Sequence, residues 1–90
     1  MELSKSNIVR STAGSTKGRL FHVLEVEDGY ALIADGKRHK LSKPKRKKLK
    51  HLEFAAESNS EAARQIRAGG DIQDSALRRS LAEYRNQGGF

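Results

Sequence analysis

The sequence predicts a mainly β domain, a small five-stranded antiparallel barrel, followed by two short helices. Five short runs rich in β-forming residues lie between residues 7 and 54, and Asp-Gly pairs separate some of them. Beyond residue 56 the spacing becomes helical and polar capping residues appear. We therefore expect two parts, a barrel in residues 1–56 and a helical pair in residues 57–90.

The first two predicted strands flank a loop of small residues. Asn7–Ser11 is typical of a short strand, and residues 12–18 (TAGSTKG) are typical of a loop. Arg19–Glu27 is the longest β-rich run, but its alternation is imperfect because Leu20 and Phe21 are both apolar. We expect this strand to be bent, or buried on both faces for part of its length, as a small barrel requires.

Two Asp-Gly pairs predict a three-stranded meander. Asp28-Gly29 and Asp35-Gly36 lie seven residues apart, each between β-rich runs. Asp-Gly is the strongest short hairpin signal, because a type I′ turn requires positive φ at both central residues. The strands of this meander would be 19–27, 30–34 and 37–41.

A last strand is expected at residues 49–54, after a loop that contains Pro44. Proline has no N–H to donate to a ladder and therefore belongs in the connection. Five short strands in about 50 residues predict a strongly curved antiparallel barrel of the SH3-like kind.

Two helices are expected after the barrel. Residues 58–60 provide N-caps for a helix over Glu61–Ala68, which Gly69-Gly70 would end. Asp74 or Ser75 would cap a second helix over Ala76–Asn86. This second helix carries an apolar stripe of Leu77, Leu81 and Tyr84. The stripe either covers an open barrel face or docks on a partner, and we favour the first because 56 residues supply only a small core.

The main functional signal is a basic run at residues 37–51, KRHKLSKPKRKKLKH, which holds nine Lys or Arg and no acid. Such side chains repel one another unless a polyanion neutralises them, and regularly spaced phosphates do so with release of counterions. Pro44 and the leucines at 41, 49 and 52 indicate an anchored segment. The alternative is a solvated charged loop or a targeting patch.

Charge is unevenly distributed between the two predicted parts. Residues 1–56 carry 13 basic and 6 acidic side chains, whereas residues 57–90 carry 5 of each. We therefore expect the barrel to face the ligand and the helices to pack against protein. The loop over residues 13–19 would contribute backbone N–H groups, hydroxyls and one lysine to phosphate binding. It is not a P-loop, because the required order of glycines and lysine is absent.

Other classes of function find little support. The chain has no cysteine, which excludes disulfides and fits a reducing cytosol, and no stretch approaches the roughly 20 apolar residues of a membrane helix. His22, His39 and His51 are too far apart in sequence to predict a metal site, so we expect neither metal nor cofactor. No nucleophile or paired-carboxylate pattern predicts an enzyme. Phe21 and Tyr30 are expected to fill the core rather than stack on bases.

Two stretches carry a resemblance to a known family. Ile8–Val26 resembles a KOW motif, with a hydrophobic strand, then Gly14-x-x-Lys17-Gly18-Arg19, then a second strand. Lys43–Glu53 (KPKRKKLKHLE) is similar to a segment of large-subunit ribosomal protein fourteen of the archaeal and eukaryotic type. The resemblance covers about residues 5–54 and is strongest to short bacterial KOW-domain relatives of that protein. Ser6-Asn7 stands where KOW sequences usually place Gly-Asp, and residues 54–56 replace the usual proline.

The resemblance implies an SH3-like barrel that binds ribosomal or other structured RNA in the cytoplasm and is monomeric off the RNA, with ribosomal proteins as further candidate partners. One alternative is a transcription-elongation-type factor that contacts polymerase and nascent RNA. Another is an SH3-like adapter for acidic or proline-rich peptides, which the low aromatic content disfavours. The predicted RNA-binding residues are Arg10, Gly14, Ser15, Thr16, Lys17, Gly18, Arg19, Lys37, Arg38, Lys43, Lys45, Arg46, Lys47, Lys48, Lys50 and His51.

Overall fold

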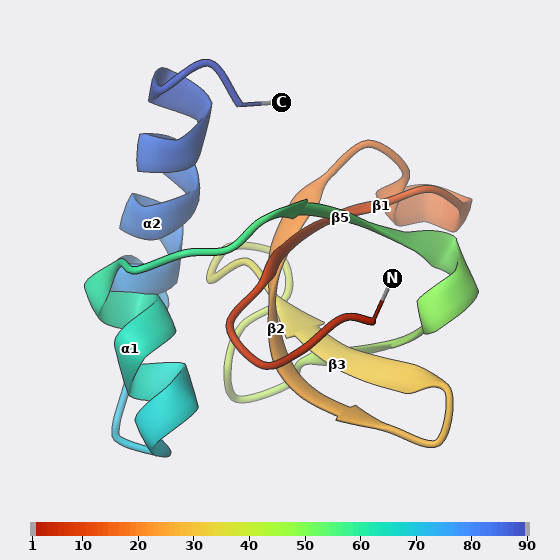
Figure 1. The fold of residues 1–90 in the computed structure, drawn as a ribbon, viewed down its shortest axis with the longest axis horizontal. Coiled ribbons are helices and arrows are strands. Elements are labelled where there is room, and N and C mark those ends of the chain that lie inside the picture. The colour runs from red at the N-terminus through yellow and green to blue at the C-terminus, as the bar shows by residue number, and fades with distance from the viewer. Residues whose placement is uncertain (1, 90) are drawn as a thin grey trace.

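A computed structural model describes residues 2–89 as one antiparallel sheet packed against two helices (Figure 1). The strands pair in the order β4-β3-β2-β1-β5. Their bounds are β1 Ile8–Ser11, β2 Leu20–Glu27, β3 Tyr30–Ala34, β4 Lys45–Lys48 and β5 Leu52–Ala56. The predicted class, five antiparallel strands followed by a helical appendage, is confirmed. In residues 2–89, no helix has the length and apolar character needed to span a bilayer.

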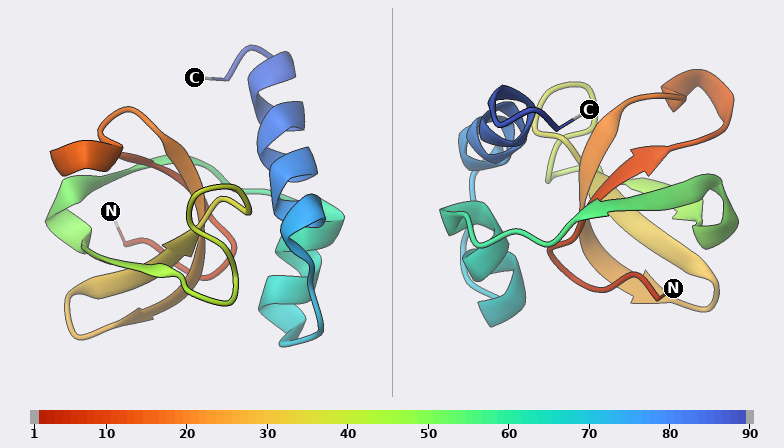
Figure 2. Two further views of the ribbon diagram at one scale, coloured as in Figure 1. Left: turned by 180° about the vertical axis from the view of Figure 1, so that it is seen from behind. Right: turned by 45° about the horizontal axis from the view of Figure 1, so that its top comes forward.

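The sheet is strongly curved, and its two edge strands are consecutive in the chain (Figures 1 and 2). A short 3-10 helix, Leu49–His51, connects β4 to β5 and so brings the two edges together at one corner. Within residues 2–89, β4 pairs with β3 and β5 pairs with β1. Closure of the sheet into a barrel by a β4–β5 pairing is not seen and stays a prediction.

Strand β2 is buried on both faces, as its imperfect alternation predicts. Phe21 and Val23 pack in the cluster on the inner side of the sheet, whereas Leu20 and Leu24 belong to the clusters beneath the helices. The pairing with β3 shifts register between Val23 and Glu25. Because side chains alternate along a strand, this extra residue returns Val26 to the inner side, where it packs on the same cluster as Val23.

The second predicted hairpin is wrong, although the first is confirmed. Asp28 and Gly29 have φ values of 50° and 78°, as a type I′ turn requires. At the second pair, one carboxylate oxygen of Asp35 accepts the backbone N–H groups of Lys37 and His39 at 2.9 and 3.0 Å. These bonds curl the chain locally, so residues 37–41 form part of a loop instead of a strand beside β3.

The strand that pairs with β3 is β4, which the prediction placed in the connection. Pro44 lies in the connection, as expected, directly before β4, where its missing N–H leaves the ladder intact. The last strand also begins later than predicted, at Leu52, because Leu49–His51 is helical.

Both predicted helices form, but only the first uses a predicted cap. Helix α1 spans Glu61–Ala68, with the Ser60 hydroxyl accepting the N–H of Ala63 at 3.1 Å. Helix α2 spans Asp74–Asn86, but neither predicted cap is used. The N-cap is Gln73, because the carboxylate of Asp74 instead accepts the backbone N–H of Leu41 at 2.8 Å.

The core has two layers, separated by the sheet. The inner layer contains Val9, Phe21, Val23, Ala31, Ile33 and Leu52. The outer layer lies between the sheet and the helices, where Leu77 packs with Ala34 and Leu81 packs with Ile8 and Leu20. The apolar stripe of α2 thus covers the chain's own sheet, as we favoured.

Candidate nucleic-acid interface

The basic run is part of the folded body. Residues 45–48 pair with β3 along the whole of β4, and the N–H of Leu49 donates to the Gly29 carbonyl at 2.9 Å. Burial alternates along the strand, with Arg46 and Lys48 exposed and Lys45 and Lys47 half-buried. The side chains predicted as one set of phosphate ligands therefore point to two different sides of the strand.

On the exposed side of β4, Arg46 stacks on Tyr30. The guanidinium carbon lies 3.6 Å from the ring centroid, which is a cation–π contact. Arg46 is exposed, and a guanidinium plane can stack a nucleobase or bind a phosphate with its N–H groups. Tyr30, which we expected to fill the core, is instead half-buried and supports this arginine. Phe21 is fully buried and fills the core as predicted.

On the other side of the strand, Lys47 connects β4 to the loop over residues 12–18. Its ammonium donates to the Ala13 carbonyl at 2.7 Å and to the Thr16 hydroxyl at 3.1 Å. That hydroxyl is also 2.8 Å from the hydroxyl of Ser11, and Thr16 is buried. Lys47 and Thr16 therefore hold β4 and this loop together. One of the three ammonium N–H groups of Lys47 is left for a ligand.

The predicted cradle of backbone N–H groups is not formed by the second half of this loop. The N–H groups of Lys17, Gly18 and Arg19 donate to carbonyls of Gly14, Ser11 and Thr16 at 2.8–3.1 Å. They are therefore occupied within the loop. Its contribution to an RNA site would come from the exposed side chains of Ser15 and Lys17 and the half-buried Arg19.

The loop over residues 35–44 presents four exposed cations from a well-anchored backbone. Besides the Asp35 bonds, the Leu41 N–H donates to Asp74, and the Arg78 guanidinium donates to the Gly36 carbonyl at 2.6 Å. The His39 ring packs 5.6 Å from the Phe21 ring. The exposed cations are Lys37, Arg38, Lys40 and Lys43.

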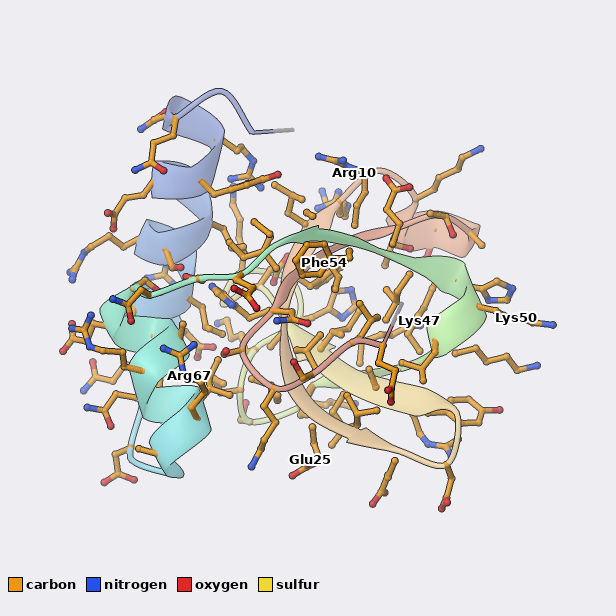
Figure 3. All side chains as sticks on the ribbon, in the orientation of Figure 1. Arg10, Glu25, Lys47, Lys50, Phe54 and Arg67 are labelled. Carbon is orange, nitrogen blue, oxygen red and sulfur yellow. The ribbon has the colours of Figure 1, made fainter. Side chains whose placement is uncertain are left out.

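Three other predicted RNA-binding residues lie in β1 and in the turn between β4 and β5. Lys50 is exposed and points outward from the turn between β4 and β5 (Figure 3). His51 is half-buried beside it, and its carbonyl accepts the N–H of Thr12 at 2.8 Å. Arg10 is the least available, because it pairs across the strands with Glu53 at 3.6 Å and its Nη2 is buried with no partner in the described chain.

His22 lies in a buried chain of polar groups that joins the sheet to the helices. Its Nδ1 is 2.9 Å from the Ser6 carbonyl, so this nitrogen carries the proton, and its Nε2 is 2.7 Å from the Ser80 hydroxyl. Ser80 in turn bonds Ser60, the cap of α1, at 2.8 Å. Burial lowers the pKa of His22, and the bond to Ser6 opposes this only in part. Among the described residues, no three potential ligands gather as a metal site would need.

Two arginines of α2 are not among the predicted RNA-binding residues. Arg78 and Arg85 border a cleft together with Arg19 and Lys37 of the predicted set. The balanced charge of residues 57–90 concealed them. Their separation of seven residues, two helical turns, places them on one face of α2 and was the available signal.

No protein-family model and no curated protein sequence matches the chain.

Proposed function

We propose that this chain is a cytoplasmic RNA-binding protein that holds structured RNA, ribosomal RNA in the first place, through phosphate and shape contacts. The observation that carries the proposal is a set of exposed cations on an anchored backbone. Within residues 2–89, none of these side chains forms an ion pair with an acid. The set, here named the basic face, comprises Lys37, Arg38, Lys43, Arg46, Lys48 and Lys50.

The physical case for a polyanion is the mutual repulsion within the basic face. With no carboxylate in ion-pair distance, these cations are relieved only by solvent ions or by a ligand. Their backbone is held by strand pairing, by Asp35 and by Asp74, so their spacing changes little. A fixed spacing favours a folded polyanion over a flexible one, because less conformational entropy is lost on binding.

The resemblance to KOW domains favours RNA among polyanions, and the turn before β1 is consistent with it. Ser6 has a φ of 76°, in the region that favours glycine, and it stands where KOW sequences usually have glycine. Asn7 stands in place of the usual aspartate, and its Oδ1 accepts the N–H of Ser4 at 2.9 Å. A Gly-Asp pair would fit the same turn without the backbone strain.

The test is the affinity of the full chain for a fluorescein-labelled RNA hairpin, measured by anisotropy over a range of salt concentrations. The variant Arg46→Gln/Lys48→Gln/Lys50→Gln removes three cations of the basic face. We expect the magnitude of the log–log salt slope to fall by about 2 to 3, at 0.7–0.9 per lost contact.

The matched control, Lys5→Gln/Arg64→Gln/Arg79→Gln, removes the same charge from exposed positions outside the basic face. Equal losses in both triple variants would mean that only net charge matters and would reject the proposed face. No RNA binding by the unaltered chain at roughly 50 mM salt would reject RNA binding itself.

The cellular RNA is identified by sedimentation of a tagged chain in sucrose gradients. Cofractionation with large ribosomal subunits that is lost at high salt supports the ribosomal proposal. Cofractionation with RNA polymerase instead favours the elongation-factor alternative. Crosslinking followed by sequencing of the attached RNA then locates the binding site.

A further inference from the structure

A cleft of about 290 Å³ lies between the start of β2, the loop over residues 35–44 and helix α2. Four cations border it, two from the sheet side (Arg19 and Lys37) and two from the helix (Arg78 and Arg85). Leu20 and Leu81 form its apolar floor and are nearly fully buried. The view from behind in Figure 2 shows the loop beside α2, where the N–H of Leu41 donates to Asp74.

The charge in this cleft is strongly positive. Among the described residues that line it, the one acid is Asp35, which is 8% exposed and accepts the backbone N–H groups of Lys37 and His39 through one oxygen. In the part of the chain that the structure describes, none of the four cations pairs with an acid at ion-pair distance. Arg78 uses one N–H on the Gly36 carbonyl and keeps the others for a ligand.

The cleft is continuous with the basic face. Lys37 belongs to both, and the loop that begins there continues through Arg38 and Lys43 to β4. Arg19 directly follows the loop over residues 12–18, which Lys47 joins to β4. A ligand that covers the basic face therefore meets the cleft at Lys37, and the loop carries further exposed cations from Lys37 to Lys43.

We propose that this cleft binds a phosphate group of the RNA backbone, which makes α2 part of the RNA interface. Three guanidinium groups suit this ligand, because their forked N–H groups bind phosphate oxygens in pairs. The apolar floor suits the sugar next to the phosphate. This inference rests on the proposed function, since it assumes that RNA is the polyanion on the basic face.

The test compares two double variants in the full chain, with the fluorescein-labelled RNA hairpin as probe. Arg78→Gln/Arg85→Gln removes the helix side of the cleft. The matched control, Arg64→Gln/Arg79→Gln, removes the same charge from helical arginines outside the cleft, of which Arg79 lies 4.0 Å from Glu61. We expect the magnitude of the salt slope to fall by about 0.7–1.8 in the cleft variant and to stay unchanged in the control.

A single variant, Arg85→Gln, excludes a structural explanation, because it leaves the bond from Arg78 to Gly36 intact. It is expected to lower the magnitude of the slope by about 0.7–0.9. In NMR spectra, the side-chain Nε–Hε signals of Arg19, Arg78 and Arg85 should shift when the hairpin is added.

Other results separate this inference from the proposed function. If the unaltered chain binds the hairpin and both cleft variants bind with its salt slope, the inference is wrong and the proposed function stands. If the cleft variants bind the hairpin as the unaltered chain does but no longer bind a poly-glutamate peptide, the cleft belongs to an acidic protein partner. The inference is then also wrong. If the unaltered chain binds no RNA, both fail.

Discussion

The ammonium nitrogen of Lys47 lies 2.7 Å from the carbonyl oxygen of Ala13. This hydrogen bond, with a second to Thr16, joins the most basic strand to the loop over residues 12–18. A residue that composition marks as a ligand of phosphate is therefore also a structural link. It determines where the loop stands relative to the basic face.

Replacing Lys47 with methionine should lower stability. The Lys47→Met side chain retains an apolar stem but leaves the Ala13 carbonyl and the Thr16 hydroxyl without this donor. We expect a loss of about 1–3 kcal/mol in the free energy of unfolding, measured in urea. Lys48→Met, at an exposed position on the same strand, should change it by less than about 0.5 kcal/mol. Equal stabilities of the two variants would contradict the linking role.

Gly36 should be far less replaceable than Gly29. Both have positive φ, 76° and 78°, so alanine costs about 1–2 kcal/mol at either site from backbone strain. At Gly36 the added Cβ would also lie 2.3 Å from the Asp74 carbonyl oxygen, whereas nothing lies within 4 Å at Gly29. We expect Gly36→Ala to be the more destabilising by at least about 1 kcal/mol in urea unfolding. A smaller cost than that of Gly29→Ala would mean that the loop and α2 are not in close contact.

Stability should fall as pH decreases below 6.5, partly because of His22. The pKa of His22 in the folded chain is lowered from 6.5 by burial, so the unfolded chain binds more protons between that lowered value and 6.5. The free energy of unfolding therefore decreases as pH falls through this interval, by at most about 1.4 kcal/mol per pH unit for one proton.

Urea unfolding between about pH 8 and pH 5 measures this dependence. The variant His22→Gln should show a flatter pH profile than the unaltered chain. An unchanged profile for His22→Gln would show that His22 is not the responsible group.

Removal of the helices should abolish cooperative folding. A chain that ends at Ala56 exposes Ile8, Leu20 and Ala34, which pack against the helices in the full chain. We expect circular dichroism of this fragment to show no cooperative thermal transition. In the full chain, Leu77→Ala should cost about 2–5 kcal/mol. A fragment as stable as the full chain would mean that α2 contributes little to the core and is free to serve a partner.

The affinity for RNA should depend steeply on salt. If the basic face neutralises about six phosphates, the logarithm of the binding constant falls against the logarithm of salt concentration with a slope of about −4 to −5. Anisotropy titrations with the RNA hairpin measure this slope. A slope near zero would exclude an electrostatic mechanism.

Local sequence signals determined most of the secondary structure, because their causes are local. Asp28-Gly29 specifies its own turn through positive φ, and Ser60 and Gly69 define the ends of α1 through hydrogen bonds within a few residues. The burial of β2 on both faces could also be predicted from the sequence. Adjacent residues of a strand point to opposite faces, so two apolar neighbours such as Leu20 and Phe21 need apolar surroundings on both faces. The concentration of positive charge in residues 37–51 is likewise a property of the sequence.

Only the tertiary structure decided how that charge is arranged. Asp35-Gly36 carries the same hairpin signal as Asp28-Gly29, yet contacts with Asp74 and Arg78, distant in sequence, accompany a loop there, and β4 takes the strand position. The same packing brings Arg78 and Arg85 to one cleft with Arg19 and Lys37. Sequence patterns report what each segment prefers alone, whereas strand partners and cleft neighbours depend on which distant surfaces are buried together.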